Sequence, residues 1–230
     1  MVEEPVRPTP APYERPVQGS ATPQEAWDRQ SGLEVLRAGI AGELPSPPIH
    51  HLTGLRPVEA GEGTATFVMP ATGWHTSPVA TVEGGFIALL ADSALACAIQ
   101  TTLPPGTAYA TIDLVVNFLR PVPPDGRDLS ATGTVAHRGR SIAVAHAEVT
   151  NADGKRVALA SGTSVILPSR PAALASSDEV LPDPDEGGTA WPPRGRSGGA
   201  FPEPGLLALS GIEQMRVWKA GRGRSRRSDG

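Results

Sequence analysis

The sequence predicts an α+β domain in which one long apolar helix packs against an antiparallel sheet. Residues 83–100 are apolar over the length of a helix and follow a glycine pair. Three later segments with the character of strands are joined by short glycine-containing turns, a pattern that indicates consecutive hairpins. One helix placed early and followed by hairpin-linked strands is typical of an α+β fold with the helix on one sheet face.

The composition predicts one complete domain with proline-rich flanks. The chain has 230 residues and is 39% hydrophobic, which is enough for a core. Its 25 Pro and 26 Gly exceed what a compact domain uses, and they gather at both ends. We therefore expect a disordered tail at 1–23, the domain at 24–168, a linker at 169–204, and an amphipathic helix with a basic tail at 205–230.

Charge, apolar length and cysteine content limit the partners and the cellular location that we expect for the protein. A net charge of -4 gives no general attraction for nucleic acid or anionic lipid, so neither is an expected partner. The longest apolar stretch, 84–99, is shorter than the roughly 20 residues that span a bilayer and contains Asp92. The single cysteine, Cys97, and the acidic, proline-rich start without an export signal favour the cytoplasm.

The elements follow in order along the chain. Apolar spacing predicts an amphipathic helix between Pro23 and Gly42, and then a loop at Pro47-Pro48. Alternation over 63–69 predicts the first strand, and the helix at 83–100 ends before Pro104.

The remaining segments predict four more strands, at 111–119, 129–137, 141–150 and 157–167. In the first of these, the period of two places Ile112, Leu114, Val116 and Phe118 on one face, opposite Thr111, Asp113 and Asn117. Short turns at 138–140 and 153–154 join the others into a meander.

The C-terminal region repeats a pattern seen near the N-terminus. Residues 210–221 resemble residues 31–42 in their Ser, Gly, Glu, Arg, Ala and Gly positions. Either the chain begins a second copy of the same unit, or the two segments are unrelated amphipathic helices.

Asp92 is the candidate catalytic residue. Its helical neighbours at three, four and seven positions are all apolar or glycine, so the acid is not on a solvated stripe. Burial of an unpaired carboxylate costs several kcal/mol and raises its pKa. Asp92 is either a general base or nucleophile, or a structural partner for a buried group.

The glycine pair at the helix start favours the catalytic interpretation. The first amides of a helix lack partners within it, and glycines let a ligand approach them closely. Such amides stabilise the oxyanion that forms when water attacks a thioester. Gly84 and Asp92 are separated by roughly 12 Å of helix rise, so a shared site needs two chains with antiparallel helices.

Three stretches of the sequence, 83–94, 117–121 and 137–141, together carry a family resemblance. Through them, about residues 50–167 resemble the hotdog-fold PaaI-like acyl-CoA thioesterases. It implies a long central helix wrapped by an antiparallel sheet, a homodimer or homotetramer, an acyl-CoA substrate, and no cofactor. It further implies an oxyanion amide from Gly84 beside Gly85, an activating Asp92, an assisting Thr111, and a CoA contact at the turn of Arg138, Gly139, Arg140 and Ser141.

Two positions depart from the family pattern. Glu83 replaces the usual histidine, and Ser77 replaces a frequent asparagine six residues before it. Ser77 keeps a hydrogen-bonding group, whereas a carboxylate at 83 would repel an oxyanion unless it were neutral or turned away. Glu83 is therefore either part of the active site or an acid favoured by the helix dipole.

Other candidates are weaker. The histidines lack metal spacing, so no metal site is predicted, and Cys97 is expected in the core. Arg138 and Arg140 either bind CoA phosphates or form an exposed turn, while Trp74 and His75 either border the acyl pocket or pack in a loop.

We therefore predict an acyl-CoA thioesterase. The alternatives are a non-catalytic acyl-CoA or aromatic-ligand binding protein and an interaction protein using its C-terminal helix. A dehydratase is less favoured because its Asp/His motif is not recognisable.

Overall fold

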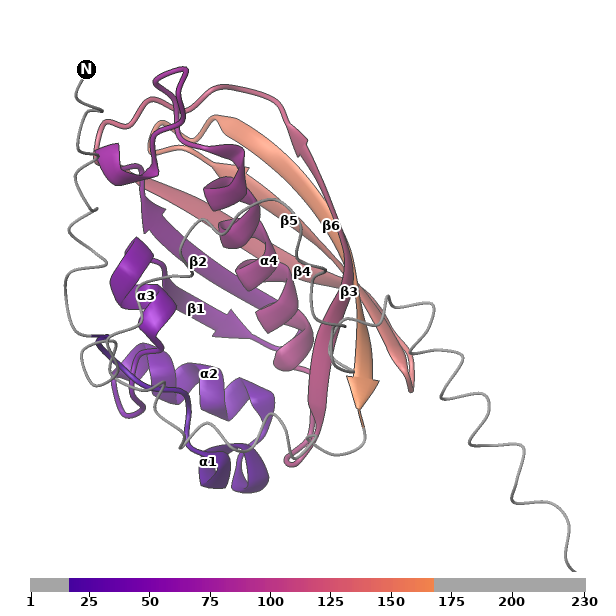
Figure 1. The fold of residues 1–230 in the computed structure, drawn as a ribbon. Helices are drawn as coiled ribbons and strands as arrows, with labels where there is room; N and C mark the ends of the chain where they lie inside the picture. The colour runs from indigo at the N-terminus through magenta and orange to yellow at the C-terminus, as the bar shows by residue number, and fades with distance from the viewer. Residues whose placement is uncertain (1–16, 168–230) are drawn as a thin grey trace, which may run out of the picture. The chain divides into compact units, whose positions relative to one another are not determined.

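A computed structural model describes residues 17–167 (Figure 1). Its elements are α1 (Gln24–Arg29), α2 (Gly32–Ala41), α3 (Pro48–Thr53), β1 (Arg56–Gly61), β2 (Thr64–Pro70), a 3-10 turn (Gly73–His75), α4 (Gly84–Gln100), β3 (Ala108–Phe118), β4 (Asp128–Arg138), β5 (Ile142–Thr150) and β6 (Arg156–Leu167). The α+β arrangement is confirmed, and the five predicted strands agree with β2 to β6 to within three residues at each end.

The sheet has six antiparallel strands in the order β1-β2-β4-β5-β6-β3. Figure 1 shows α4 lying across one face of this curved sheet. Although β3 follows α4 directly in sequence, among residues 17–167 it pairs only with β6, and so it forms one edge of the sheet. The two edges of this sheet are therefore β1 and β3.

The helix α4 forms because its residues are strong helix formers that also bury well. Glu83 caps its N-terminus, and the chain turns away at Thr101, three residues before Pro104. On the sheet side Leu90, Leu95 and Ile99 are fully buried. Each contributes roughly 1.5–3 kcal/mol to stability through removal of apolar area from water.

A glycine in β4 permits this close packing. A Cβ added at Gly133 would lie 2.2 Å from the carbonyl oxygen of Ala94 in α4. No larger residue fits there unless the helix moves away from the sheet.

The single N-terminal helix predicted between Pro23 and Gly42 was wrong, because the structure has two helices there, α1 and α2. The break lies at Ser31, whose side chain accepts from the Glu34 amide while Glu34 caps the Ser31 amide. This capping box starts a new helix. The sequence contains the required Ser and Glu three residues apart, a signal that the apolar spacing had concealed.

The expected loop at Pro47-Pro48 and the residues after it contain two further elements. Pro48 is the first residue of α3, a position that proline favours because its missing amide has no partner there. The strand β1 was not predicted because Pro57 and a bulge between Pro57 and Glu59 interrupt its alternation. Its signal was the Glu62-Gly63 turn, where Gly63 has a φ of +70° and joins β1 to β2.

The predicted two faces of β3 needed correction. A bulge between Thr111 and Asp113 makes Ile112 the extra residue of the strand. Ile112 is consequently 42% exposed instead of sharing the half-buried face of Leu114 and Val116. Because of the bulge, Thr111 before it and Leu114 after it both face α4.

Several predictions lie wholly or mainly outside the described residues. They are the proline-rich tail at 1–23 except for its last seven residues, the linker at 169–204, the helix and basic tail at 205–230, and the repeat of 31–42 at 210–221. Residues 17–22 have neither helix nor strand, and the Ser20 amide donates to the Ser46 carbonyl oxygen. The proposed division into domains stays a prediction.

Candidate active site

Asp92 and Thr111 form the centre of the candidate site. The Thr111 hydroxyl donates to Asp92 Oδ1 at 3.2 Å, and so joins α4 to the edge strand β3. Asp92 is half-buried, and desolvation raises the pKa of its carboxyl, while the bond from Thr111 opposes that rise. A carboxylate with a raised pKa and one fixed hydrogen bond has the properties of a general base or of a nucleophile.

The outer face of α4 surrounds this acid. We define the outer face by Gly85, Ala88, Leu89, Asp92 and Ser93, which follow one another at helical spacing and are exposed or half-buried. The opposite side of the helix is covered by the sheet. The acid thus lies on the less buried side of α4, where it meets the β3 edge.

The N-terminus of α4 holds a second group of candidates. Glu83 is the N-cap residue, and its Oε1 accepts from the Gly84 amide at 3.2 Å. A Cβ added at Gly84 would lie 3.1 Å from the Phe118 ring, so the end of β3 packs directly on this turn. Gly85 is exposed, with nothing within 4 Å of an added Cβ. The Gly84 amide, which is expected to serve as an oxyanion donor, is therefore bound by the Glu83 carboxylate and lies at a turn that packs on the Phe118 ring.

The loop before α4 separates the remaining candidates. Ser77 is half-buried and its hydroxyl pairs with Thr81 at 3.3 Å, within the turn that leads into the helix. Trp74 is 65% exposed, whereas His75 is 3% exposed and stacks on Phe86 with ring centroids 4.2 Å apart. His75 belongs to the packing of this loop, where desolvation lowers its pKa.

The turn between β4 and β5 lies at the other end of α4. Arg138 Nε donates to the Thr102 hydroxyl at 3.2 Å, and its guanidinium also bonds the Gly139 carbonyl. The Gly139 amide donates to Ile142 at 2.8 Å, which closes the hairpin, while Arg140 and Ser141 are exposed. Arg138 is therefore held against the C-terminal end of the helix.

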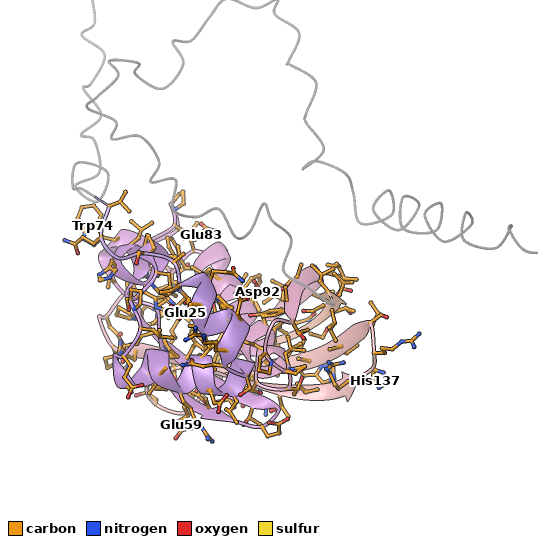
Figure 2. All side chains as sticks on the ribbon, turned by 90° about the horizontal axis from the view of Figure 1, so that it is seen from below. Glu25, Glu59, Trp74, Glu83, Asp92 and His137 are labelled. Atoms are coloured by element: carbon orange, nitrogen blue, oxygen red, sulfur yellow. The ribbon has the colours of Figure 1, made fainter. Side chains whose placement is uncertain are left out.

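The predicted site residues thus form three groups along one helix. Figure 2 shows Trp74 and Glu83 near one end, His137 at the other, and Asp92 between them. From Gly84 to Thr102 the helical rise is about 27 Å. The structure brings Asp92 to Thr111 and Glu83 to Gly84, but within one protomer it joins neither pair to the 138–141 turn.

Sequence reasoning missed a buried polar cluster next to Asp92. Gln100 Oε1 accepts from the Tyr109 hydroxyl at 3.1 Å and from the Cys97 thiol at 3.7 Å. Burial raises the pKa of the Cys97 thiol to about 12, so this thiol stays protonated and is no nucleophile at neutral pH. The one available signal was Tyr109, which lies two residues before Thr111 and so faces the same way.

Two further findings concern the described part of the chain. Within residues 17–167, no cluster of three or more His, Cys, Asp or Glu side chains is arranged to hold a metal ion. None of the helices found there has the length and apolar character needed to cross a membrane.

Comparisons with known proteins agree with this architecture. The sequence profile of the Thioesterase superfamily matches residues 80–158, a range that includes α4, Asp92 and Thr111. A search of curated proteins gives no match.

Solved structures give the closer comparison. The PaaI protein of the phenylacetic acid degradation operon of E. coli is 27% identical with a TM-score of 0.53, covering 60% of this chain and 98% of its own. A phenylacetic acid degradation-related protein from Ralstonia eutropha is also 27% identical, with a TM-score of 0.52 and coverage of 56% and 98%. A thioesterase from Haemophilus influenzae, 23% identical with a TM-score of 0.51 over 61% and 94%, shares the fold.

A long helix wrapped by a six-stranded antiparallel sheet, with an acid at the sheet edge, defines a hotdog-fold protein. Residues 80–158 match the thioesterase superfamily, and the hotdog domain is similar to PaaI proteins. These matches support thioester hydrolysis as the general class of activity.

Proposed function

We propose that the protein hydrolyses an acyl-CoA thioester to a free acid and CoA. The observation that carries this proposal is the Asp92–Thr111 pair, a carboxylate of raised pKa fixed on the outer face of α4 in a thioesterase-superfamily fold. No cofactor is needed, because attack of water on a thioester requires a base and an oxyanion donor.

Asp92 can act in either of two ways. As a general base it takes a proton from water, whose oxygen attacks the thioester carbonyl; the C–S bond then breaks and the thiolate of CoA receives the proton. As a nucleophile its carboxylate displaces the thiolate and forms an acyl-aspartyl anhydride, which water hydrolyses to the free acid. In both routes the negative oxygen of the intermediate is stabilised by the Gly84 amide.

The complete site requires two protomers. Gly84 and Asp92 are about 12 Å apart along one helix, so the oxyanion amide would come from a partner whose α4 runs antiparallel. The β3 edge supports this arrangement, since it lies beside Asp92 and exposes Ile112 and Val115, with 42% and 55% of their surface accessible. A homodimer is the minimal assembly, and a homotetramer would contain two such pairs.

The 138–141 turn is proposed to hold the CoA arm. In an antiparallel pair, the C-terminal end of one α4 lies toward the partner's Gly84, so this turn of the Asp92 protomer is on the side from which CoA would extend. Arg140 and Ser141 are exposed there, and a guanidinium pairs well with phosphate. Arg138 is already bound to Thr102 and Gly139, so we assign it to shaping the turn.

One observation favours a second candidate function. Glu83 Oε1 occupies the Gly84 amide, and a carboxylate there opposes a developing oxyanion. The same fold would then bind acyl-CoA or an aromatic ligand without turnover. Hydrolysis requires that the Glu83 side chain leave Gly84 when the substrate carbonyl arrives, and Ser77, in the same loop, would help to orient that carbonyl.

The test is hydrolysis of a panel of acyl-CoAs by wild type, by Asp92→Asn, and by Glu59→Gln as a matched change of carboxylate to amide on β1. We expect Asp92→Asn to reduce kcat at least roughly 100-fold and Glu59→Gln to leave it unchanged. Equal rates for wild type and Asp92→Asn would disprove the mechanism. Tight binding of acyl-CoA without turnover by wild type would favour the second candidate. A cytoplasmic location stays a prediction.

A further inference from the structure

A pocket of about 220 Å³ lies at the C-terminal end of α4, apart from the residues assigned to catalysis. It is bounded by α1, the end of α4, and the start of β3. Its lining residues are Gln24, Trp27, Gln100, Gly106, Thr107, Ala108 and Tyr109.

Backbone hydrogen bonds hold the walls of this pocket in place. The Gly106 amide donates to the Trp27 carbonyl at 2.8 Å, which ties α1 to the loop before β3. The Gly32 amide donates to Leu103 at 3.0 Å, and Gln100 Nε2 donates to the Gly32 carbonyl at 3.0 Å. Because two main-chain bonds and one bond from the Gln100 side chain join these segments, the pocket is preformed.

The interior of the pocket is suited to an apolar group. Gln100 uses its carbonyl oxygen for Tyr109 and Cys97 and one amide hydrogen for Gly32. Trp27, Tyr109 and Ala108, which carry two aromatic rings and a methyl group, are among the other residues that line the pocket. A cavity of roughly 150 Å³ with apolar walls can hold benzene, so this pocket has room for an aliphatic tail or one ring.

The pocket is also close to the reacting position. Tyr109 lies two residues before Thr111 on the same inward side of β3, about 7 Å away, and Thr107 lies about 13 Å away. Burial raises the pKa of both Tyr109 and Cys97, and the nearby negative charge of Asp92 adds to that rise. A group that starts at Asp92 and follows β3 toward its beginning reaches the pocket after roughly 10 Å.

Building on the proposed thioesterase activity, we propose that this pocket receives the far end of the acyl group and selects medium-length aliphatic or aryl-alkyl acyl-CoAs. Short acyl groups end before Tyr109 and gain nothing from the pocket. Longer ones place their terminal carbons between Trp27, Tyr109 and Ala108. The N-terminal helix α1 thereby becomes a determinant of substrate choice.

The experiment measures kcat/KM for straight-chain substrates from acetyl-CoA to decanoyl-CoA and for phenylbutyryl-CoA. For wild type, each methylene that enters the pocket should raise kcat/KM about fourfold. Thr107→Phe fills the pocket and should lower kcat/KM at least about tenfold for the long and aryl-alkyl substrates while acetyl-CoA changes less than about twofold. Thr134→Phe, on the opposite face of the sheet, is the matched control, and Ala108→Leu replaces Thr107→Phe if that variant melts early.

The outcomes separate the two proposals. A profile without dependence on acyl length, or an equal effect of the filling variant on every substrate, overturns the pocket assignment and leaves the thioesterase intact. Absence of hydrolysis of every acyl-CoA by wild type overturns both.

Discussion

Both sides of α4 carry apolar residues, but the two sides differ in burial. Toward the sheet, Leu90, Leu95 and Ile99 are fully buried. On the outer face, Leu89, Asp92 and Ser93 are only half-buried, although Asp92 is the only charged residue within the helix. A helix that is apolar all round is normally covered all round. The difference teaches that the sheet side stabilises the protomer, whereas the outer face is left for the interface and the chemistry that we propose.

The largest expected effect separates stability from activity. Leu95→Ala removes a fully buried side chain that packs on β6 near Gly162, and it should lower the free energy of unfolding by about 2–5 kcal/mol. Leu159→Ala, at a site that is 39% exposed, is the control and should cost much less. Denaturant unfolding measures both. If kcat per folded molecule fell with Leu95→Ala as strongly as with an outer-face change, the division between the two sides would be wrong.

A smaller effect is expected on the outer face, where Thr111→Val removes the hydrogen bond to Asp92 and keeps the side-chain volume. That bond lowers the pKa of Asp92 against the larger effect of burial, so its loss raises the pKa further. A base must be deprotonated, and activity therefore falls as pH drops through this pKa. In the variant the acidic limb of the pH–rate profile should move to higher pH, with kcat roughly tenfold lower at neutral pH.

The control for this prediction is Thr66→Val, since Thr66 pairs with Thr132 away from Asp92. A uniform loss of kcat at every pH, without a shift of the limb, would contradict the assigned role of Thr111. Thermal unfolding should show little change in either variant.

The smallest effect concerns the helix start, where both sides of α4 meet. Glu83→Gln keeps an oxygen that can accept from the Gly84 amide and removes the charge. Because a negative charge there opposes an oxyanion, kcat should rise about threefold, as measured with the best acyl-CoA substrate. A fall of tenfold or more would instead assign Glu83 a direct part in the reaction.

The central helix and five strands could be predicted from the sequence, because each has a regular apolar period or ends at a clear turn residue. Elements were missed where two local signals in the same segment indicate different structures. The apolar spacing across 24–41 hid the capping box at Ser31, and Pro57 hid β1, which tolerates proline because it is an edge strand. The strand order places β3 at the edge of the sheet opposite β1. This order depends on contacts between residues distant in sequence, which no local sequence pattern indicates.

The candidate site was predictable only in part for the same reason. Asp92 could be found because its helical neighbours are apolar, and the family resemblance gave Thr111 as an assisting residue, while the hydrogen bond between the two came only from the structure. The bond between Glu83 and Gly84 and the packing of Phe118 on Gly84 depend on backbone angles and on the end of a distant strand. The pocket beside Tyr109 needs three segments to meet, so spacing within any one of them could not reveal it.

The bulge in β3 changes which residues of the strand face the helix. Before Ile112 the odd-numbered residues Tyr109 and Thr111 face the helix, and after it the even-numbered Leu114 and Val116 do so. One surplus residue thus lets a single strand present polar groups to the acid and apolar groups to the core. Deletion of Ile112 would restore regular pairing with β6, and the residues before and after it would still face the helix. In a strand without a bulge, deletion of one residue would instead turn all the side chains on one side of the deletion to the opposite face. Of the eleven residues of β3, Ile112 is thus the position at which a change in length is best tolerated.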